Sequence, residues 1–147
     1  MLGLQVDNAM EVGKRWDLFI AYVVEDEEEI ARPLNIALNA KRLKVWSGNY
    51  ALRVGDNLHE SIDYGLVLAK AGIVILSNHF FGKHWPHEEL DYLATCEVSG
   101  KKVIFPIWHK VGFQEVFEYS AALADRVATS TDKGLEYVVR RILEVAK

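Results

Sequence analysis

Apolar residues along the chain follow two alternating patterns. Short apolar runs rich in aromatic and β-branched residues predict buried strands at residues 16–24, 43–46, 71–76, 102–108 and 126–129. Apolar residues at helical spacing predict helices that open at residue 25 and cover residues 58–69, 85–97, 111–119 and 131–145. Strands that alternate with helices indicate an α/β fold, a flavodoxin-like three-layer sandwich around a parallel sheet of about five strands.

The segments between these elements define the organisation of the chain. Residues 1–15 show only a weak helical pattern, so we interpret them as an N-terminal leader that carries no chemistry. Residues 47–57 and 77–84 are polar enough to be loops. There is no internal repeat, linker or low-complexity tract, so we expect one domain over residues 16–147.

Composition narrows the function classes. The 147 residues are 26% charged with a formal net charge of −4, and no Lys/Arg-rich run marks a nucleic-acid surface or an anionic membrane as partner. No apolar stretch resembles a signal peptide or a bilayer span. Cys96 is the only cysteine, which excludes an internal disulfide and favours a reducing, cytoplasmic compartment.

The topology predicts where a ligand would bind. In open parallel sheets, ligands bind beyond the carboxyl ends of the strands, where the winding direction reverses. For a flavodoxin-like order this crevice lies between the first and third strands, so the loops at 22–26 and 77–85 should line it. The polar groups there are His79, His84, His87, Glu88 and Glu89.

Several familiar chemistries do not fit these loops. The third strand ends Leu76-Ser77-Asn78, so it has no aspartate that could accept a phosphoryl group. A Gly-x-Gly-x-x-Gly loop, a Walker loop and a Gly-x-Ser-x-Gly motif are all missing from the sequence. The histidines match no common zinc spacing, so we expect no metal site.

An ordered set of motifs covers most of residues 16–108. These motifs are Asp17-Leu-Phe-Ile-Ala-Tyr22, Leu43-Lys-Val-Trp46, Leu52-Arg-Val-Gly-Asp-Asn-Leu58, Ile73-Val-Ile-Leu-Ser77, Phe80-Phe81, Trp85-Pro-His-Glu-Glu-Leu-Asp91 and Val103-Ile-Phe-Pro-Ile-Trp108. Together they resemble a Toll/interleukin-1 receptor (TIR) domain of the prokaryotic type. The resemblance implies the TIR fold, in which the loop after the second strand is called the BB loop.

The resemblance also implies an enzyme. Many members cleave NAD+ at the nicotinamide–ribose bond and release nicotinamide with ADP-ribose or a cyclic isomer, so NAD+ is a substrate and no further cofactor is expected. The catalytic glutamate of the Trp-x-x-x-Glu motif falls on Glu89, whereas Glu88 does not match. One carboxylate is chemically sufficient, because nicotinamide leaves as a neutral molecule and needs no general acid. Outside the family pattern, a glutamate in the first turn of a helix more often serves the helix dipole.

Other residues are predicted to contact the substrate. Trp85 would shape the pocket wall, and the end of the first strand would form its floor through backbone amides. Basic residues would neutralise the pyrophosphate, although each is equally well explained as a solvated loop charge, and the Phe80-Phe81 pair as core packing. The predicted substrate-binding residues are Tyr22, Val23, Val24, Arg53, Phe81, Lys83 and Trp85.

Two departures from the family pattern bear on activity. Ala21 stands where the first motif commonly has serine, and Ser47-Gly48-Asn49 are uncharged where related bacterial domains are often acidic. Family members commonly become active on self-association, with the loop at 47–56 completing a neighbour's site. The resemblance therefore implies an assembling NAD+ nucleosidase in bacterial immune defence or signalling. The alternative is a non-catalytic module that binds other TIR domains through residues 52–58.

Overall fold

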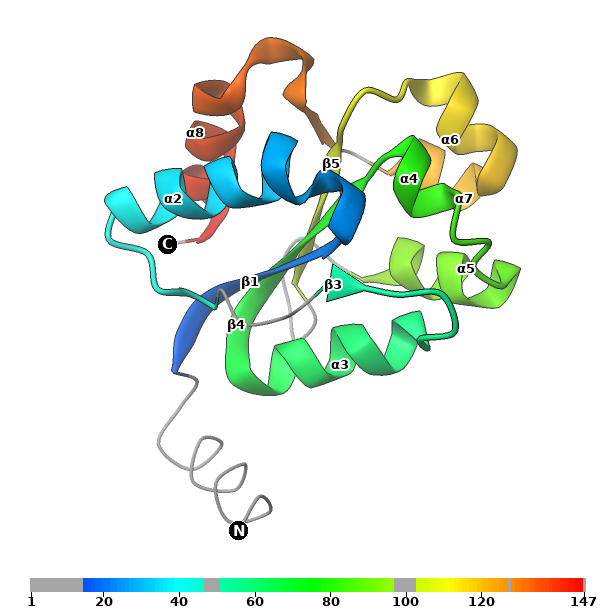
Figure 1. Ribbon diagram of the computed structural model, residues 1–147, viewed down its shortest axis with the longest axis horizontal. Coiled ribbons are helices and arrows are strands. Elements are labelled where there is room, and N and C mark those ends of the chain that lie inside the picture. The colour runs from blue at the N-terminus through cyan, green and yellow to red at the C-terminus, as the bar shows by residue number, and fades with distance from the viewer. Residues whose placement is uncertain (1–14, 47–50, 97–102, 127, 147) are drawn as a thin grey trace, which may run out of the picture.

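The computed structural model describes residues 15–46, 51–96, 103–126 and 128–146. Within these ranges a parallel sheet has the order β2-β1-β4-β5-β6, and a short strand, β3, pairs with the end of β1 (Figure 1). The strands are β1 (Trp16–Val23), β2 (Val45–Trp46), β3 (Ala51–Leu52), β4 (Ala69–Leu76), β5 (Ile104–Trp108) and β6 (Thr129–Ser130). The described part of the chain thus confirms the predicted flavodoxin-like fold.

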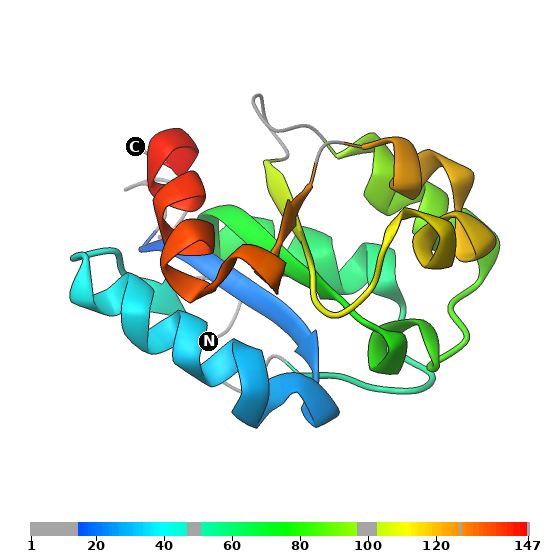
Figure 2. The same cartoon turned by 90° about the horizontal axis from the view of Figure 1, so that it is seen from above.

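Helices cover both faces of the sheet, as the view from above shows (Figure 2). One face carries η1 (Val24–Asp26), η2 (Glu27–Ala31), α2 (Arg32–Ala40), η3 (Thr131–Lys133) and α8 (Leu135–Ala146). The other carries α3 (Leu58–Leu68), α4 (Asn78–Phe81), α5 (His87–Thr95), α6 (Phe113–Tyr119) and α7 (Ala121–Asp125). The sheet is therefore buried on both sides, which explains why its strands read as nearly continuous apolar runs.

Alternation along the strands builds two cores. On β1, Leu18 and Ile20 face α2 and α8, whereas Phe19 and Ala21 face α3 and its neighbours. All four side chains are almost completely buried. The period of two along each strand fixes which side chains serve each core, because a shift of one residue would exchange the two sets.

Short elements that the sequence pattern did not predict lie within the expected loops. Residues 47–57 were expected to be a loop throughout, but Ala51 and Leu52 pair with the last two residues of β1. The expected loop at 77–84 contains α4, whose start is capped by the Ser77 hydroxyl. Helix α5 begins at His87, so Pro86 lies just outside it rather than at its first position. Elements as short as β3 and α4 show no apolar periodicity in the sequence, and tertiary contacts hold them in place.

The remaining expectations fall partly outside the described residues. The proposed leader, apart from Arg15, and the segment Ser47-Gly48-Asn49 are not described. In the part of the chain that is described, no helix combines the length and the apolarity that crossing a bilayer requires.

The Phe19 ring sets the distance between α3 and the sheet. It is completely buried between Gly65 on α3 and Gly72 on β4. A Cβ atom on Gly65 would lie 2.6 Å from Phe19 Cζ, and one on Gly72 would lie 2.2 Å from the same atom. Because neither glycine has a side chain, helix and strand both approach the ring closely, and this contact fixes the position of α3.

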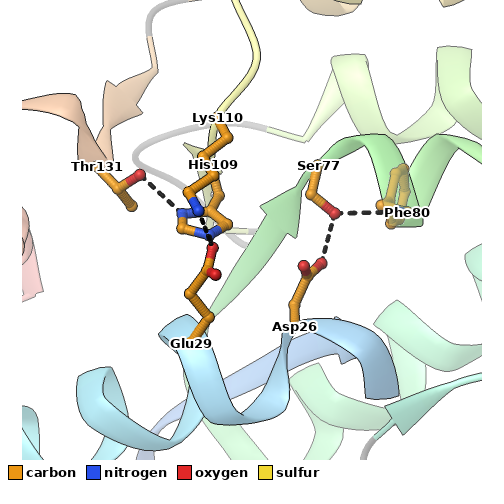
Figure 3. A network of polar contacts seen from close by, with 7 residues as sticks. All are labelled: Asp26, Glu29, Ser77, Phe80, His109, Lys110 and Thr131. Carbon is orange, nitrogen blue, oxygen red and sulfur yellow. Dashed lines mark hydrogen bonds and ion pairs between the residues drawn. The ribbon is translucent and has the colours of Figure 1, made fainter.

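At the carboxyl ends of the central strands, a buried pair joins β4 to the turn after β1 (Figure 3). The Ser77 hydroxyl donates a hydrogen bond to the Asp26 carboxylate, and both residues are 2% exposed. The same hydroxyl oxygen accepts the backbone N–H of Phe80 at 3.0 Å. The Ser77 hydroxyl therefore both satisfies the buried Asp26 carboxylate and caps the start of α4.

A second group of side chains joins β5 to both neighbouring helical segments (Figure 3). His109 is 7% exposed; its Nε2 lies 2.5 Å from Glu29 Oε1 and its Nδ1 2.8 Å from Thr131 Oγ1. Lys110 Nζ lies 2.8 Å from the same Glu29 oxygen. Glu29 therefore meets two groups from the turn after β5, and the hydrogen bonds from Lys110 and His109 hold its pKa below the ordinary value.

Replacing Gly65 by alanine tests the Phe19 contact. Alanine ordinarily stabilises a helix relative to glycine by about 1 kcal/mol. Here the added methyl group collides with a buried ring, so we expect the free energy of unfolding to fall by about 1–3 kcal/mol. Urea denaturation measures the change. Combining Gly65→Ala with Phe19→Leu should cost less than the sum of the single changes, and a stabilised Gly65→Ala protein would contradict the interpretation.

The Glu29 contacts predict a pH-dependent contribution to stability. A carboxyl group with a lowered pKa stabilises the fold above its unfolded pKa, and this contribution is lost as the pH falls through the folded pKa. Glu29→Gln should therefore lower the melting temperature near pH 7, and the difference from the unaltered protein should shrink below about pH 4.5. Thermal melts at several pH values measure it, with Glu118→Gln on exposed α6 as a control for charge. A difference that persists unchanged in acid would refute the prediction.

Candidate active site

Glu89 lies where two helices begin. It occupies the first turn of α5, and its backbone N–H bonds the Pro86 carbonyl at 3.0 Å. Its carboxylate oxygen Oε1 accepts the backbone N–H of Leu58, the first residue of α3, at 2.5 Å. The carboxylate is partly buried, and the positive ends of both helix dipoles point to it. This geometry holds one negative charge in a fixed position at the edge of the α3/α5 layer.

Trp85 anchors the start of α5. Its ring is 8% exposed, packs on Phe80 with centroids 5.5 Å apart, and donates its indole N–H to the Phe80 carbonyl at 2.9 Å. The preceding residue, His84, has a left-handed backbone with φ of 57°, which turns the chain sharply before the tryptophan. Trp85 thereby fixes the direction in which α5 presents Glu89.

A groove of about 500 Å³ runs beside α3. It is bounded by α3, β2, β3 and the turn that leads into α3. The lining residues are Trp46, Ala51, Leu52, Asp56, Asn57, Glu60, Ser61 and Tyr64. Asn57, at one end of the groove, directly precedes Leu58, whose N–H binds the Glu89 carboxylate, but Glu89 itself does not line the groove. Its aromatic rings, carboxylates and hydroxyl groups suit a polar ligand with a flat ring.

The crevice expected between the first and third strands is a separate, smaller cavity of about 160 Å³. The predicted loops do meet there, since the Asp26–Ser77 pair joins them. Glu89 is not among the residues that line this cavity, which are Glu25, Asp26, Glu29, Ser77, Asn78, His79, His109 and Lys110. Glu89 lines neither this cavity nor the groove beside α3.

The three residues predicted to bind substrate at the end of the first strand have different environments. Tyr22 is partly buried and donates its hydroxyl to Glu27 at 3.1 Å; burial, and then this hydrogen bond, raise its pKa. Val23 is fully buried and pairs with Leu52 of β3, whereas Val24 is 61% exposed. Of the three side chains, only that of Val24 is largely open to solvent.

The two predicted basic residues have partners of their own. Lys83 Nζ lies 2.8 Å from Glu25 Oε2, and the lysine side chain is mostly buried. The backbone N–H of Arg53 donates to the Asp56 carboxylate at 2.9 Å, which closes the turn before α3, while the residue itself is exposed. Arg53 directly follows the groove residue Leu52 in the chain, whereas the charge of Lys83 is already paired with Glu25.

Phe81 is a core residue in this structure. It is 1% exposed and stacks on Tyr119 with centroids 4.5 Å apart. A ligand would have to displace this packing to reach the ring. The structure therefore does not bring Phe81 together with Glu89 at an open surface.

Sequence reasoning missed the groove residues Trp46, Glu60 and Tyr64. The sequence indicates only that Glu60 and Tyr64 share one exposed side of the predicted helix, because they are four residues apart. Nothing in the sequence places Trp46 beside Tyr64, although their ring centroids are 5.8 Å apart. Among the residues that the structure describes, no group of three or more His, Cys, Asp or Glu side chains is arranged to hold a metal ion.

Comparison with known proteins finds related sequences over most of this chain. Residues 18–137 match the TIR domain family. An NAD(+) hydrolase, TcpA, from a Theionarchaea archaeon is 46% identical over 94% of this chain and 42% of its own length. A 2' cyclic ADP-D-ribose synthase, AbTIR, from Acinetobacter baumannii is 40% identical over 92% of this chain and 51% of its own length. The chain thus spans about half the length of these relatives or less.

A solved structure supports the fold independently. The TIR domain of the Toll-related receptor TRR-2 from Hydra magnipapillata superposes with a TM-score of 0.59 at 22% identity, over 88% of this chain and 95% of the receptor domain. At that identity the likeness concerns the fold alone. Together with the match over residues 18–137, it shows that this chain belongs to the TIR domain family.

Proposed function

We propose that this chain is an NAD+ nucleosidase that cleaves the nicotinamide–ribose bond, with Glu89 as its catalytic residue. The observation that carries the proposal is the Glu89 carboxylate, held by the backbone N–H of Leu58 at the start of α3. Relatives that share 40–46% identity with this chain are named as NAD(+) hydrolases or 2' cyclic ADP-D-ribose synthases. The released ADP-ribose moiety is therefore either hydrolysed or cyclised.

The chemistry needs little more than a well-placed negative charge. As the bond to nicotinamide breaks, positive charge develops on the ribose, and nicotinamide leaves as a neutral molecule. A carboxylate beside the ribose stabilises this charge more in the transition state than in the substrate, and that difference accelerates cleavage.

The contact between Glu89 and Leu58 suits this role. Oxygen Oε1 is held by the Leu58 N–H, which fixes the carboxylate without neutralising its charge. Oxygen Oε2 then serves the substrate, where it accepts a ribose hydroxyl or faces the developing cation. A fixed carboxylate needs no reorganisation at the moment of reaction, and this preorganisation is a large part of electrostatic catalysis.

Self-association is the second part of the proposal, with a role in bacterial defence or signalling. Val54, in the turn before α3, is 72% exposed and offers an apolar contact beside the groove, whereas Leu52 is buried and cannot contribute. The alternative function, a non-catalytic module that binds other TIR domains, would use the same turn. The single cysteine of the chain supports a reducing, cytoplasmic setting.

Incubation of the purified protein with NAD+ tests the proposal. Released nicotinamide is followed by chromatography, and the second product is identified by mass spectrometry. We expect Glu89→Gln to lower kcat by about 10²–10³-fold, because the amide keeps the size of the side chain but loses its charge.

Glu88→Gln is the matched control, since it removes an exposed charge from the same turn of α5 and should leave the rate unchanged. Melting temperatures establish that both variants fold. Equal rates in the Glu89→Gln variant and the unaltered protein would refute the proposed role of Glu89. If the unaltered protein releases no nicotinamide even at concentrations where it self-associates, the non-catalytic module is the better description.

A further inference from the structure

The side of α3 that faces α5 carries a compact group of polar and aromatic side chains. The Tyr92 hydroxyl of α5 donates a hydrogen bond to Asp63 Oδ1 of α3. His59, one turn before Asp63, stacks on the Tyr92 ring with centroids 3.5 Å apart and planes inclined by 20°. The His59 Nε2 atom lies 3.1 Å from Asp63 Oδ2. The two carboxylate oxygens of Asp63 thus contact different partners, and Tyr92 is held through both its ring and its hydroxyl.

The same two helices carry the contact that holds Glu89. On α3, Leu58 immediately precedes His59, and its backbone N–H donates to Glu89 Oε1 at 2.5 Å. On α5, Glu89 and Tyr92 are three residues apart, so they share one face of the helix and are separated by about 4.5 Å along its axis. The boundary between α3 and α5 therefore has two consecutive attachments, one at Glu89 and the next about one turn later at Tyr92.

The attachment at Tyr92 restricts the rotation of α5. Burial, followed by the hydrogen bond to Asp63, raises the pKa of the Tyr92 hydroxyl, so this group keeps its proton and remains a donor at neutral pH. A hydrogen bond to a carboxylate is shorter and stronger than one between neutral groups. The stacked His59 ring adds a planar contact, and the two constraints together fix the direction of the Tyr92 side chain.

The direction of the Glu89 carboxylate depends on this second attachment. The Leu58 N–H holds Oε1 alone, and one hydrogen bond leaves α5 free to rotate about it. Such a rotation would move Oε2, the oxygen that we assign to the substrate, away from its place. Misplacement of a reacting group by about 1 Å can lower a rate about 100-fold, so a remote contact that prevents it affects catalysis.

We propose that Tyr92, Asp63 and His59 are positioning residues for Glu89, which fix the rotation of α5 against α3 and thereby direct the carboxylate. All three act through Glu89. The kinetic consequence rests on the proposed nucleosidase function. The geometric consequence, a short hydrogen bond between the Leu58 N–H and Glu89, is measurable in a protein that cleaves nothing.

Tyr92→Phe tests the kinetic consequence. The variant loses one hydroxyl and keeps the aromatic ring, and α5 keeps its other anchors, because Leu90, Leu93 and Trp85 are buried. We expect kcat for NAD+ cleavage to fall about tenfold and KM to stay within about twofold, since alignment of Glu89 matters most in the transition state.

The amide proton of Leu58 tests the geometric consequence without cleavage. A short hydrogen bond to a carboxylate moves an amide proton resonance downfield. In NMR spectra, Tyr92→Phe should move the Leu58 resonance upfield, toward the position that it has in the Glu89→Gln variant. A variant that only lowered stability would have a lower melting temperature but an unchanged Leu58 resonance in the folded protein.

Matched variants assign the effect to the hydrogen bond. Asp63→Asn keeps an oxygen that accepts the Tyr92 hydroxyl and should retain most of kcat. Asp63→Leu removes the acceptor and should resemble Tyr92→Phe, and the two changes combined should cost no more than either alone. His59→Ala removes the stacked ring but keeps the hydrogen bond, so its effect should be smaller. Tyr137→Phe removes the same hydroxyl group from α8, on the other face of the sheet, and should change neither readout.

The outcomes separate this inference from the function on which its kinetics rest. An unchanged Leu58 resonance in both Tyr92→Phe and Asp63→Leu would overturn the inference, whatever the activity of these variants. A shifted resonance with an undiminished kcat would also overturn it and leave the nucleosidase function intact. A shifted resonance in a protein that does not cleave NAD+ would support the positioning of Glu89 and contradict the proposed function alone.

Discussion

The hydrogen bond from the Leu58 N–H to the Glu89 carboxylate joins the two helices on which the site depends. It places a side chain of α5 at the start of α3, so that the proposed catalytic charge and the groove share one helix end. Other contacts hold each of the two helices in place. Trp85 anchors α5 to α4, and Phe19 sets the distance of α3 from the sheet through two glycines. The position of one carboxylate therefore follows from the packing of the whole α3/α5 layer.

A second contact between the same helices strengthens this arrangement. The Tyr92 hydroxyl of α5 donates to Asp63 of α3, and the His59 ring stacks on Tyr92 with centroids 3.5 Å apart. Burial, followed by the hydrogen bond to Asp63, raises the pKa of Tyr92. Tyr92 lies one turn after Glu89 on α5, and His59 follows Leu58 on α3. Rotation of either helix would disturb both contacts, so the two helices hold Glu89 as a unit.

The sequence predicted the fold well because the fold depends on long periodic segments. Buried strands such as β1 and β4 leave a clear apolar signal, and the resemblance to the Trp-x-x-x-Glu motif of the family pointed to Glu89. The sequence predicted less of the groove. Trp46 and Tyr64 come together only through the packing of α3 on the sheet, and β3 forms two residues of strand by pairing with β1. Phe81 shows the opposite limit, because the sequence allowed both a substrate contact and core packing for it, and tertiary packing buries it against Tyr119.

The small size of the cavity at the carboxyl ends of β1 and β4 has a physical reason. In this chain that crevice is largely occupied by the protein's own side chains: Ser77 bonds Asp26, and Glu29 contacts both His109 and Lys110. These contacts satisfy the polar groups that a ligand would otherwise meet, and they leave a cavity of only about 160 Å³. The groove of about 500 Å³ beside α3 keeps its carboxylates on an open surface. The general rule for parallel sheets thus predicts an opening at the carboxyl ends of these strands, and the internal pairing of side chains limits the size of that opening in this chain.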